Sequence, residues 1–133
     1  MSRFGGQGII VTGAGDGIGR AAAQQFAEDG GTVFIVDING AAEVADQLTL
    51  RGLSAHTVTM DVRDPAAWTA LAARVKKTCG HIDVLVNNAG IAVQGDSVIE
   101  VSEDVWDRIL DINAKGVWLG MRAVLPTMVA QNS

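Results

Sequence analysis

The octapeptide TGAGDGIG, residues 12–19, follows the apolar run GIIV at residues 8–11 and precedes a helical pattern. This placement between a strand and a helix is typical of a turn that binds nucleotide phosphates. Its glycines allow the sharp chain reversal, the close approach of the main chain to a pyrophosphate, and the close packing of helix on strand. The following helix directs its unpaired N–H groups and positive dipole end at the anion. A nucleotide cofactor is therefore the first hypothesis, which a glycine pattern alone supports only weakly.

The composition predicts one folded domain without nucleic-acid or membrane partners. The chain has 133 residues, of which 48% are hydrophobic and 19% charged, and its formal net charge is −5 without a basic block. The single cysteine, Cys79, has no His or Cys at metal spacing and cannot form an internal disulfide. No segment resembles a signal peptide or a membrane span. We therefore expect a soluble, cytoplasmic protein without a metal site.

Strand-like and helix-like patterns alternate along the whole chain. Such alternation predicts an α/β fold, a doubly wound, Rossmann-like parallel sheet whose ligand crevice lies at the carboxyl ends of the first and fourth strands. We expect the third strand near a sheet edge, a loop over residues 91–100, and two final helices, with Pro126 kinking or ending the last one. The predicted strands cover residues 8–12, 32–37, 54–61 and 82–86, and the predicted helices begin near residues 17, 40, 64, 102 and 115.

Two acidic residues at predicted strand ends point to an adenine dinucleotide. Asp37 ends the second strand, near the spacing from Gly19 expected for an acid that binds a ribose diol. Its charge would repel a 2′-phosphate, and Asp16 adds a second negative charge, so the pattern favours NAD over NADP. Asp61 ends the third strand, and its carboxylate is expected to accept a hydrogen bond from the exocyclic amine of the adenine. The Val62 N–H is expected to recognise the adenine ring. Alternatively, Asp37 and Asp61 have no ligand and are simply solvent-exposed residues at the ends of their strands.

These features together resemble the short-chain dehydrogenase/reductase family. The resemblance rests on the glycine turn, Asp37, Asp61-Val62, the sequence NNAG at residues 87–90, and Asn113. It implies that Asn87 ties the sheet together by hydrogen bonds and that Asn113 positions a water in a proton relay. The cofactor-binding residues expected from the motifs are Gly13, Gly15, Asp16, Gly17, Ile18, Gly19, Asp37, Asp61, Val62, Asn88, Ala89 and Gly90.

The family's catalytic Ser, Tyr and Lys would all lie beyond the last helix, and this chain contains no tyrosine. We therefore expect residues 1–133 to form a single NAD-binding domain that is incomplete at its C-terminal side. His56 and His81 are not expected to act as acid–base groups. Trp68, Trp106 and Trp118 fall on helical faces and are expected in the core or in subunit contacts.

The resulting hypothesis is the cofactor-binding part of an NAD-dependent oxidoreductase that transfers hydride between nicotinamide and a secondary alcohol or ketone. The resemblance also implies a homo-oligomer, a dimer or tetramer in the complete protein. One alternative is a truncated or inactive module that binds NAD without turnover. Another is a methyltransferase-like nucleotide fold, against which the NNAG turn and the spacing of Gly13 and Gly17 argue.

Overall fold

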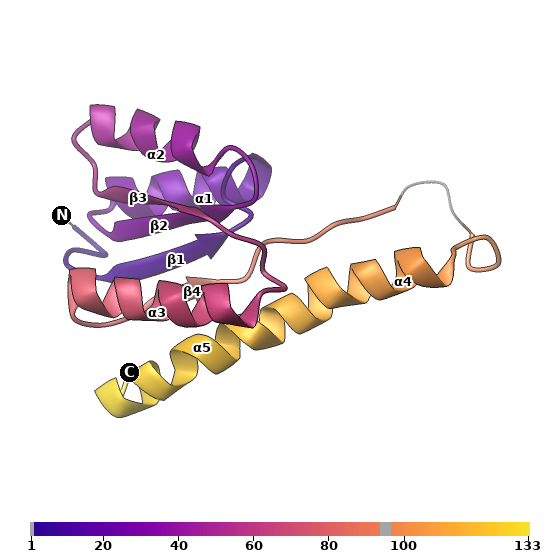
Figure 1. The fold of residues 1–133 in the computed structure, drawn as a ribbon. Coiled ribbons are helices and arrows are strands. Elements are labelled where there is room, and N and C mark those ends of the chain that lie inside the picture. The colour runs from indigo at the N-terminus through magenta and orange to yellow at the C-terminus, as the bar shows by residue number, and fades with distance from the viewer. Residues whose placement is uncertain (1, 94–96) are drawn as a thin grey trace.

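A computed structural model describes residues 2–93 and 97–133 of the chain, which form a four-stranded parallel sheet covered by helices on both faces (Figure 1). The expected α/β, doubly wound fold is thereby confirmed, as is the position of the third strand at an edge. Of the loop expected over residues 91–100, residues 94–96 lie outside the described part. The sheet order is β3-β2-β1-β4, with β1 at Gly8–Thr12, β2 at Thr32–Asp37, β3 at Ala55–Thr59 and β4 at Val84–Val86.

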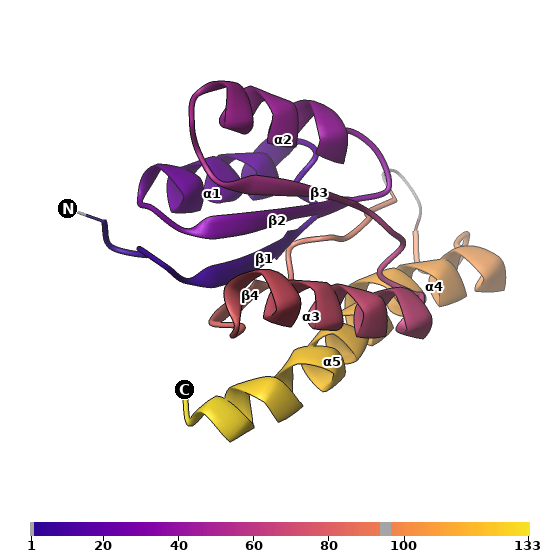
Figure 2. The same ribbon diagram turned by 60° about the vertical axis from the view of Figure 1, so that its left-hand side comes forward.

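The two central strands are buried because helices cover both of their faces. All five residues of β1 are buried, as expected of an apolar strand inside a parallel sheet. One core contains Ile9 and Val11 with residues of α1 and α2, and the other contains Ile10 with residues of α3 and α5. Figures 1 and 2 show these two helix pairs on opposite faces of the sheet.

From β1, the chain adds β2 and β3 on one side of the sheet and then reverses direction, crossing over to add β4 on the other side. β1 pairs with β2 on one side, with Gly8 opposite Thr32, and with β4 on the other, with Ile9 opposite Val84. In open parallel sheets, ligands bind outside the carboxyl ends of the strands at this reversal. The turns after β1 and β4 therefore meet where the sequence predicts the crevice.

The first three helices begin and end where local signals predict. Asp64 caps α3 by accepting hydrogen bonds from the N–H groups of Ala66 and Ala67, Pro65 occupies the first turn, and Gly80 ends the helix at φ 84°. No helix within residues 2–93 and 97–133 combines the length and the apolar character required to cross a bilayer. The helices are α1 (Gly17–Glu28), α2 (Ala41–Leu50), α3 (Pro65–Cys79), α4 (Glu103–Leu110) and α5 (Gly116–Gln131).

The two expected final helices are present as α4 and α5, and they run on from one another as one continuous helix, called the long helix below (Figure 1). A π-helical turn, Asp111–Lys115, joins them, and Leu110 and Gly116 on either side keep right-handed helical angles. Pro126 lies inside α5 without ending it. Proline removes one helical hydrogen bond, but the burial of Leu119 and Val124 stabilises α5 before that position, and Met128 packs against the same core after it.

Candidate functional site

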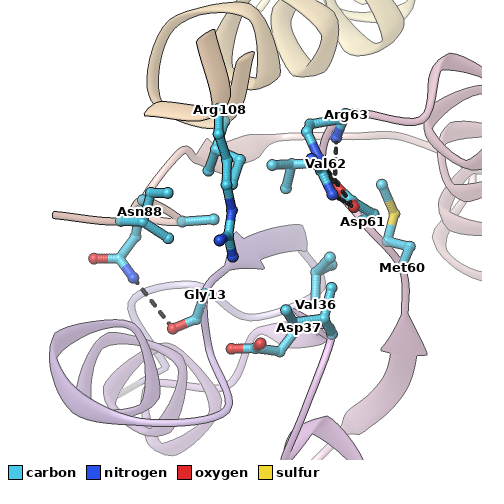
Figure 3. A pocket seen from close by; sticks show the side chains of 14 residues that line it. Gly13, Val36, Asp37, Met60, Asp61, Val62, Arg63, Asn88 and Arg108 are labelled. Carbon is cyan, nitrogen blue, oxygen red and sulfur yellow. Dashed lines mark hydrogen bonds and ion pairs between the residues drawn. The ribbon is translucent and has the colours of Figure 1, made fainter. Parts of the chain in front are cut away.

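A cavity of about 260 Å³ opens at the carboxyl ends of the strands (Figure 3). It lies between the ends of β2 and β3 and the turns that follow β1 and β4, and the long helix contributes Arg108 and Ile112. The structure thus gathers residues that are far apart in the sequence. The predicted site residues that line the cavity are Gly13, Asp37, Asp61, Val62, Asn88, Ala89 and Gly90.

Asp37 connects the end of β2 to the glycine turn. Its Oδ2 accepts a hydrogen bond from the Gly15 N–H at 2.9 Å, and its Oδ1 accepts one from the Asn39 N–H at 3.2 Å. These bonds fix the carboxylate at the cavity wall. Each carboxylate oxygen can accept a second hydrogen bond, so the group can still receive two hydroxyl protons.

The glycine turn leaves the start of α1 open to an anion. Asp16 occupies the N-cap position but makes no side-chain cap bond, and the first turn of α1 carries no acidic side chain. Gly17 has φ 56°, and the neighbouring Ile18 is 82% exposed. These features suit phosphate oxygens, which the helix N–H groups would bind directly.

The tightest packing in this turn is at Gly15 and Gly19, which have no room for a side chain. A Cβ at Gly15 would lie 2.1 Å from the Asn39 carbonyl oxygen, and a Cβ at Gly19 would lie 2.2 Å from that of Gly13. Gly15 therefore allows the turn to lie against the segment after β2, and Gly19 allows α1 to start against the end of β1. Gly15, Asp16, Gly17, Ile18 and Gly19 are not among the residues that line the cavity.

Asn88 joins the ends of β1 and β4. Its Nδ2 donates to the carbonyl oxygens of Thr12 at 3.1 Å and Gly13 at 3.2 Å, the latter shown in Figure 3. The backbone N–H groups of Asn88 and Ala89 both donate to Thr12 Oγ1 at 3.0 Å. The sequence assigned this role to Asn87, whose Oδ1 instead faces Gly120 of α5. Asn88 therefore makes the hydrogen bonds expected of Asn87, and it also lines the cavity.

Asp61 reaches the cavity as a partner of Arg63. The Arg63 Nη2 donates to Asp61 Oδ2 at 2.6 Å, and its Nε lies 3.0 Å from both carboxylate oxygens (Figure 3). These hydrogen bonds hold the pKa of Asp61 below its usual value. Asp61 is therefore a carboxylate at neutral pH, with most of its accepting capacity already used.

Asn113 lies in the π-helical turn, behind the cavity wall. Its Nδ2 donates to the Ile91 carbonyl oxygen and its Oδ1 accepts from the Ile91 N–H, both at 2.8 Å. Ile91 and Gly90 line the cavity, whereas Asn113 does not. Asn113 thus positions the chain that follows the NNAG turn. π-Helical turns are often found at functional sites.

Several lining residues did not follow from the sequence. Arg63 was expected only at the surface, and Arg108 belongs to a helix far along the chain from Asp37. The apolar residues at strand ends could have been found from their position directly before the predicted acids. The lining residues not predicted for the site are Val36, Ile38, Met60, Arg63, Ile91, Arg108 and Ile112.

The two histidines lie outside this cavity. His56 stacks on Phe34, with ring centroids 4.8 Å apart, and burial lowers its pKa. His81 Nδ1 lies 2.6 Å from Asp83 Oδ2, which also accepts from the Gly8 N–H at the amino end of the sheet. Neither histidine is among the residues that line the cavity.

Known proteins are similar to this chain in sequence. The family model for short chain dehydrogenase matches residues 7–133. Oxidoreductase UcpA of Escherichia coli strain K12 is 43% identical over 132 residues, which cover 98% of this chain and 50% of that protein. Meso-2,3-butanediol dehydrogenase of Serratia marcescens is 38% identical over 129 residues, which cover 96% of this chain and 50% of that protein.

Two solved structures have a similar fold. A metagenomic short-chain oxidoreductase in complex with NADP superposes with a TM-score of 0.88 at 32% identity, covering 96% of this chain and 59% of that one. A putative short-chain dehydrogenase/reductase from Burkholderia xenovorans superposes with a TM-score of 0.91 at 33% identity. The match covers 98% of this chain and 54% of that one. The chain spans about half the length of the curated relatives it matches. From the family match over residues 7–133 and these relatives, we conclude that the chain belongs to the short-chain dehydrogenase family.

Proposed function

We propose that this chain is the cofactor-binding part of an NAD-dependent oxidoreductase. The observation that carries the proposal is the geometry of Asp37, whose carboxylate is fixed beside the glycine turn by the Gly15 and Asn39 N–H groups. A carboxylate so placed can accept both hydroxyl protons of the adenosine ribose. The same charge repels a 2′-phosphate, which would face it without a compensating partner.

The residues of the glycine turn fit a pyrophosphate. Gly17, Ile18 and Gly19 present the start of α1, where Asp16 makes no side-chain cap bond. Asp61 and Val62 would meet the adenine, and Asn88, Ala89 and Gly90 would border the ribose. When bound, the nicotinamide supplies the hydride chemistry, and the chain's own residues hold and orient the cofactor.

The proposed substrate is a small secondary alcohol or ketone. Asn113 would position a water for the proton relay, through the π-helical turn that carries it. The chain has no tyrosine to transfer the substrate proton, so we infer that residues 1–133 bind cofactor without turning substrate over. The second candidate, an NAD-binding module without any catalytic role, shares this absence of tyrosine.

We further infer a cytoplasmic homo-oligomer. Several large apolar residues of the long helix are exposed in the single chain, which suits contact with a second copy. A single cysteine, which cannot form an internal disulfide, suits a reducing compartment. The exposed apolar residues are Trp106, Leu110, Trp118, Met121, Leu125 and Val129.

Titration with NADH, NADPH and S-adenosylmethionine tests the cofactor assignment. The wild-type chain is expected to bind NADH more tightly than NADPH and not to bind S-adenosylmethionine. Asp37→Ala should weaken NADH binding about tenfold or more and narrow the preference over NADPH, because it removes two hydrogen bonds to the ribose and the negative charge. Asp46→Ala, an exposed acid on α2, is the matched control. Unchanged selectivity in Asp37→Ala would refute the ribose role.

A further inference from the structure

Arg108 extends from α4 into the cavity. Figure 3 shows its side chain extending away from its own helix toward Gly13, with Asn88 on one side and Val62 and Asp61 on the other. Asp104 precedes Arg108 by four residues, a spacing that favours an ion pair on the helix surface. No such pair forms among the described residues, because the side chain turns toward the cavity instead.

The two arginines of the cavity differ in their partners. Arg63 donates to Asp61 from both Nε and Nη2, so its guanidinium is held by a carboxylate of the protein. Arg108 has no side-chain hydrogen bond or ion pair within residues 2–93 and 97–133. A guanidinium without a protein partner in a cavity can serve a ligand, since its five donors and its planar faces are unused.

Apart from Arg108 and from the Arg63 guanidinium, which is paired with Asp61, the described lining of the cavity offers neither an aromatic ring nor another planar cation to stack on a purine. None of its described lining residues is aromatic. Ile112 lies one helical turn from Arg108, so the two side chains meet the same part of a ligand. The start of α1, which suits phosphates, does not line this cavity. The part of a dinucleotide that enters it is therefore the adenosine end.

We propose that Arg108 is a cofactor-binding residue whose guanidinium stacks on the adenine of the dinucleotide. This proposal rests on the proposed NAD-binding function and adds a residue to it. Guanidinium planes stack on nucleobases and attract their π-faces. Asp61 and Val62 would meet the edge of the ring, while Arg108 covers one face. The long helix would thereby contribute to adenine recognition.

The test compares NADH affinity in the full chain and its variants, followed by the fluorescence of the reduced nicotinamide. Arg108→Ala is expected to weaken NADH binding about five- to tenfold. The loss should be similar at about 50 mM and about 500 mM salt, because stacking is screened less than a contact with phosphate. Arg108→Lys keeps the positive charge but lacks the planar guanidinium, so its NADH affinity should lie between those of Arg108→Ala and wild type. Arg51→Ala, at the end of α2, is the matched control and should bind like wild type.

Unchanged affinity of Arg108→Ala would overturn the inference. So would a loss that disappears at the higher salt concentration, or full recovery by Arg108→Lys, since either indicates a charge contact with phosphate. Alanine favours helix at this exposed position, so misfolding is not expected, and circular dichroism checks this. A wild-type chain that binds no NADH would instead refute the proposed function itself.

Discussion

The side-chain amide of Asn113 forms two hydrogen bonds with the backbone of Ile91, one in each direction and both 2.8 Å long. Gln131 forms the same pair with Ile82, accepting from its N–H at 2.9 Å and donating to its carbonyl at 2.8 Å. In both cases a side-chain amide takes the place of a neighbouring strand. The long helix thus holds the extended segment around β4 at both of its ends, and only one end adjoins the cavity.

Asn113→Ala should lower both stability and cofactor affinity. It removes two hydrogen bonds at an exposed position, which should cost about 1–2 kcal/mol of unfolding free energy. NADH binding should also weaken, because Ile91 and Gly90 lose the contact that positions them at the cavity. Urea denaturation and NADH titration measure the two effects.

Gln131→Ala provides the matched control for this variant. It removes the same kind of bond pair at the end of the segment remote from the cavity, so a similar loss of stability is expected with unchanged NADH affinity. Equal effects of both variants on NADH binding would show that Asn113 acts only through overall stability.

The strands and their order were predictable because burial leaves a strong pattern in the sequence. β1 and β2 are continuous apolar runs, and the acid or glycine that follows each one marks its end. The extent of the shorter edge strands was less predictable: β4 covers Val84–Val86, although the apolar pattern begins at Ile82. The Ile82 backbone pairs with the Gln131 side chain rather than with a strand, a contact that no local pattern encodes.

The site was predictable only where a motif fixed the backbone. The glycine turn, Asp37 and the NNAG sequence each follow a strand, so their meeting point follows from the parallel topology. Arg108 reaches the cavity from a helix whose path depends on the π-helical turn, and Arg63 is set by the position of Asp61. Such side chains depend on tertiary packing, which neither spacing nor propensity reveals.

Gly15→Ala should destabilise the fold more than Gly17→Ala. A Cβ at Gly15 would overlap the Asn39 carbonyl oxygen and crowd the Asp37 carboxylate, so the loop must move at a cost of about 1–3 kcal/mol. At Gly17 nothing lies within 4 Å, and the cost is the strain of φ 56°, about 1 kcal/mol. Urea denaturation of both variants checks the order, which equal stabilities would contradict.

Stability should fall on acidification through the titration of His56. Burial and, secondarily, Arg74 lower the pKa of His56 below its usual 6.5 in the folded chain. The unfolded chain therefore takes up the proton first as the pH falls. The stabilising contribution is complete above pH 6.5 and is lost as the pH falls through the lower pKa of the folded state.

His56→Gln should flatten this part of the stability profile. Urea denaturation at several pH values from about 7.5 to about 5 compares the variant with wild type. The chain has two histidines, and the variant also identifies the His56 signal in an NMR titration. A slope that persists unchanged in His56→Gln would assign the pH dependence to other groups.

Leu125→Glu should convert the proposed homo-oligomer to monomers. Trp68 is 1% exposed, as expected of a core residue, whereas Trp118 is 50% and Leu125 48% exposed in the single chain. Contact with a second copy would remove these side chains from water, and a buried, unpaired carboxylate there would cost several kcal/mol, on the order of 3–5. Sedimentation of wild type and variant measures the change. Arg74→Ala, on α3, is an exposed control that should leave the assembly intact. A wild-type chain that sediments as a monomer would contradict the oligomer, and an unchanged mass for Leu125→Glu would place the contact elsewhere.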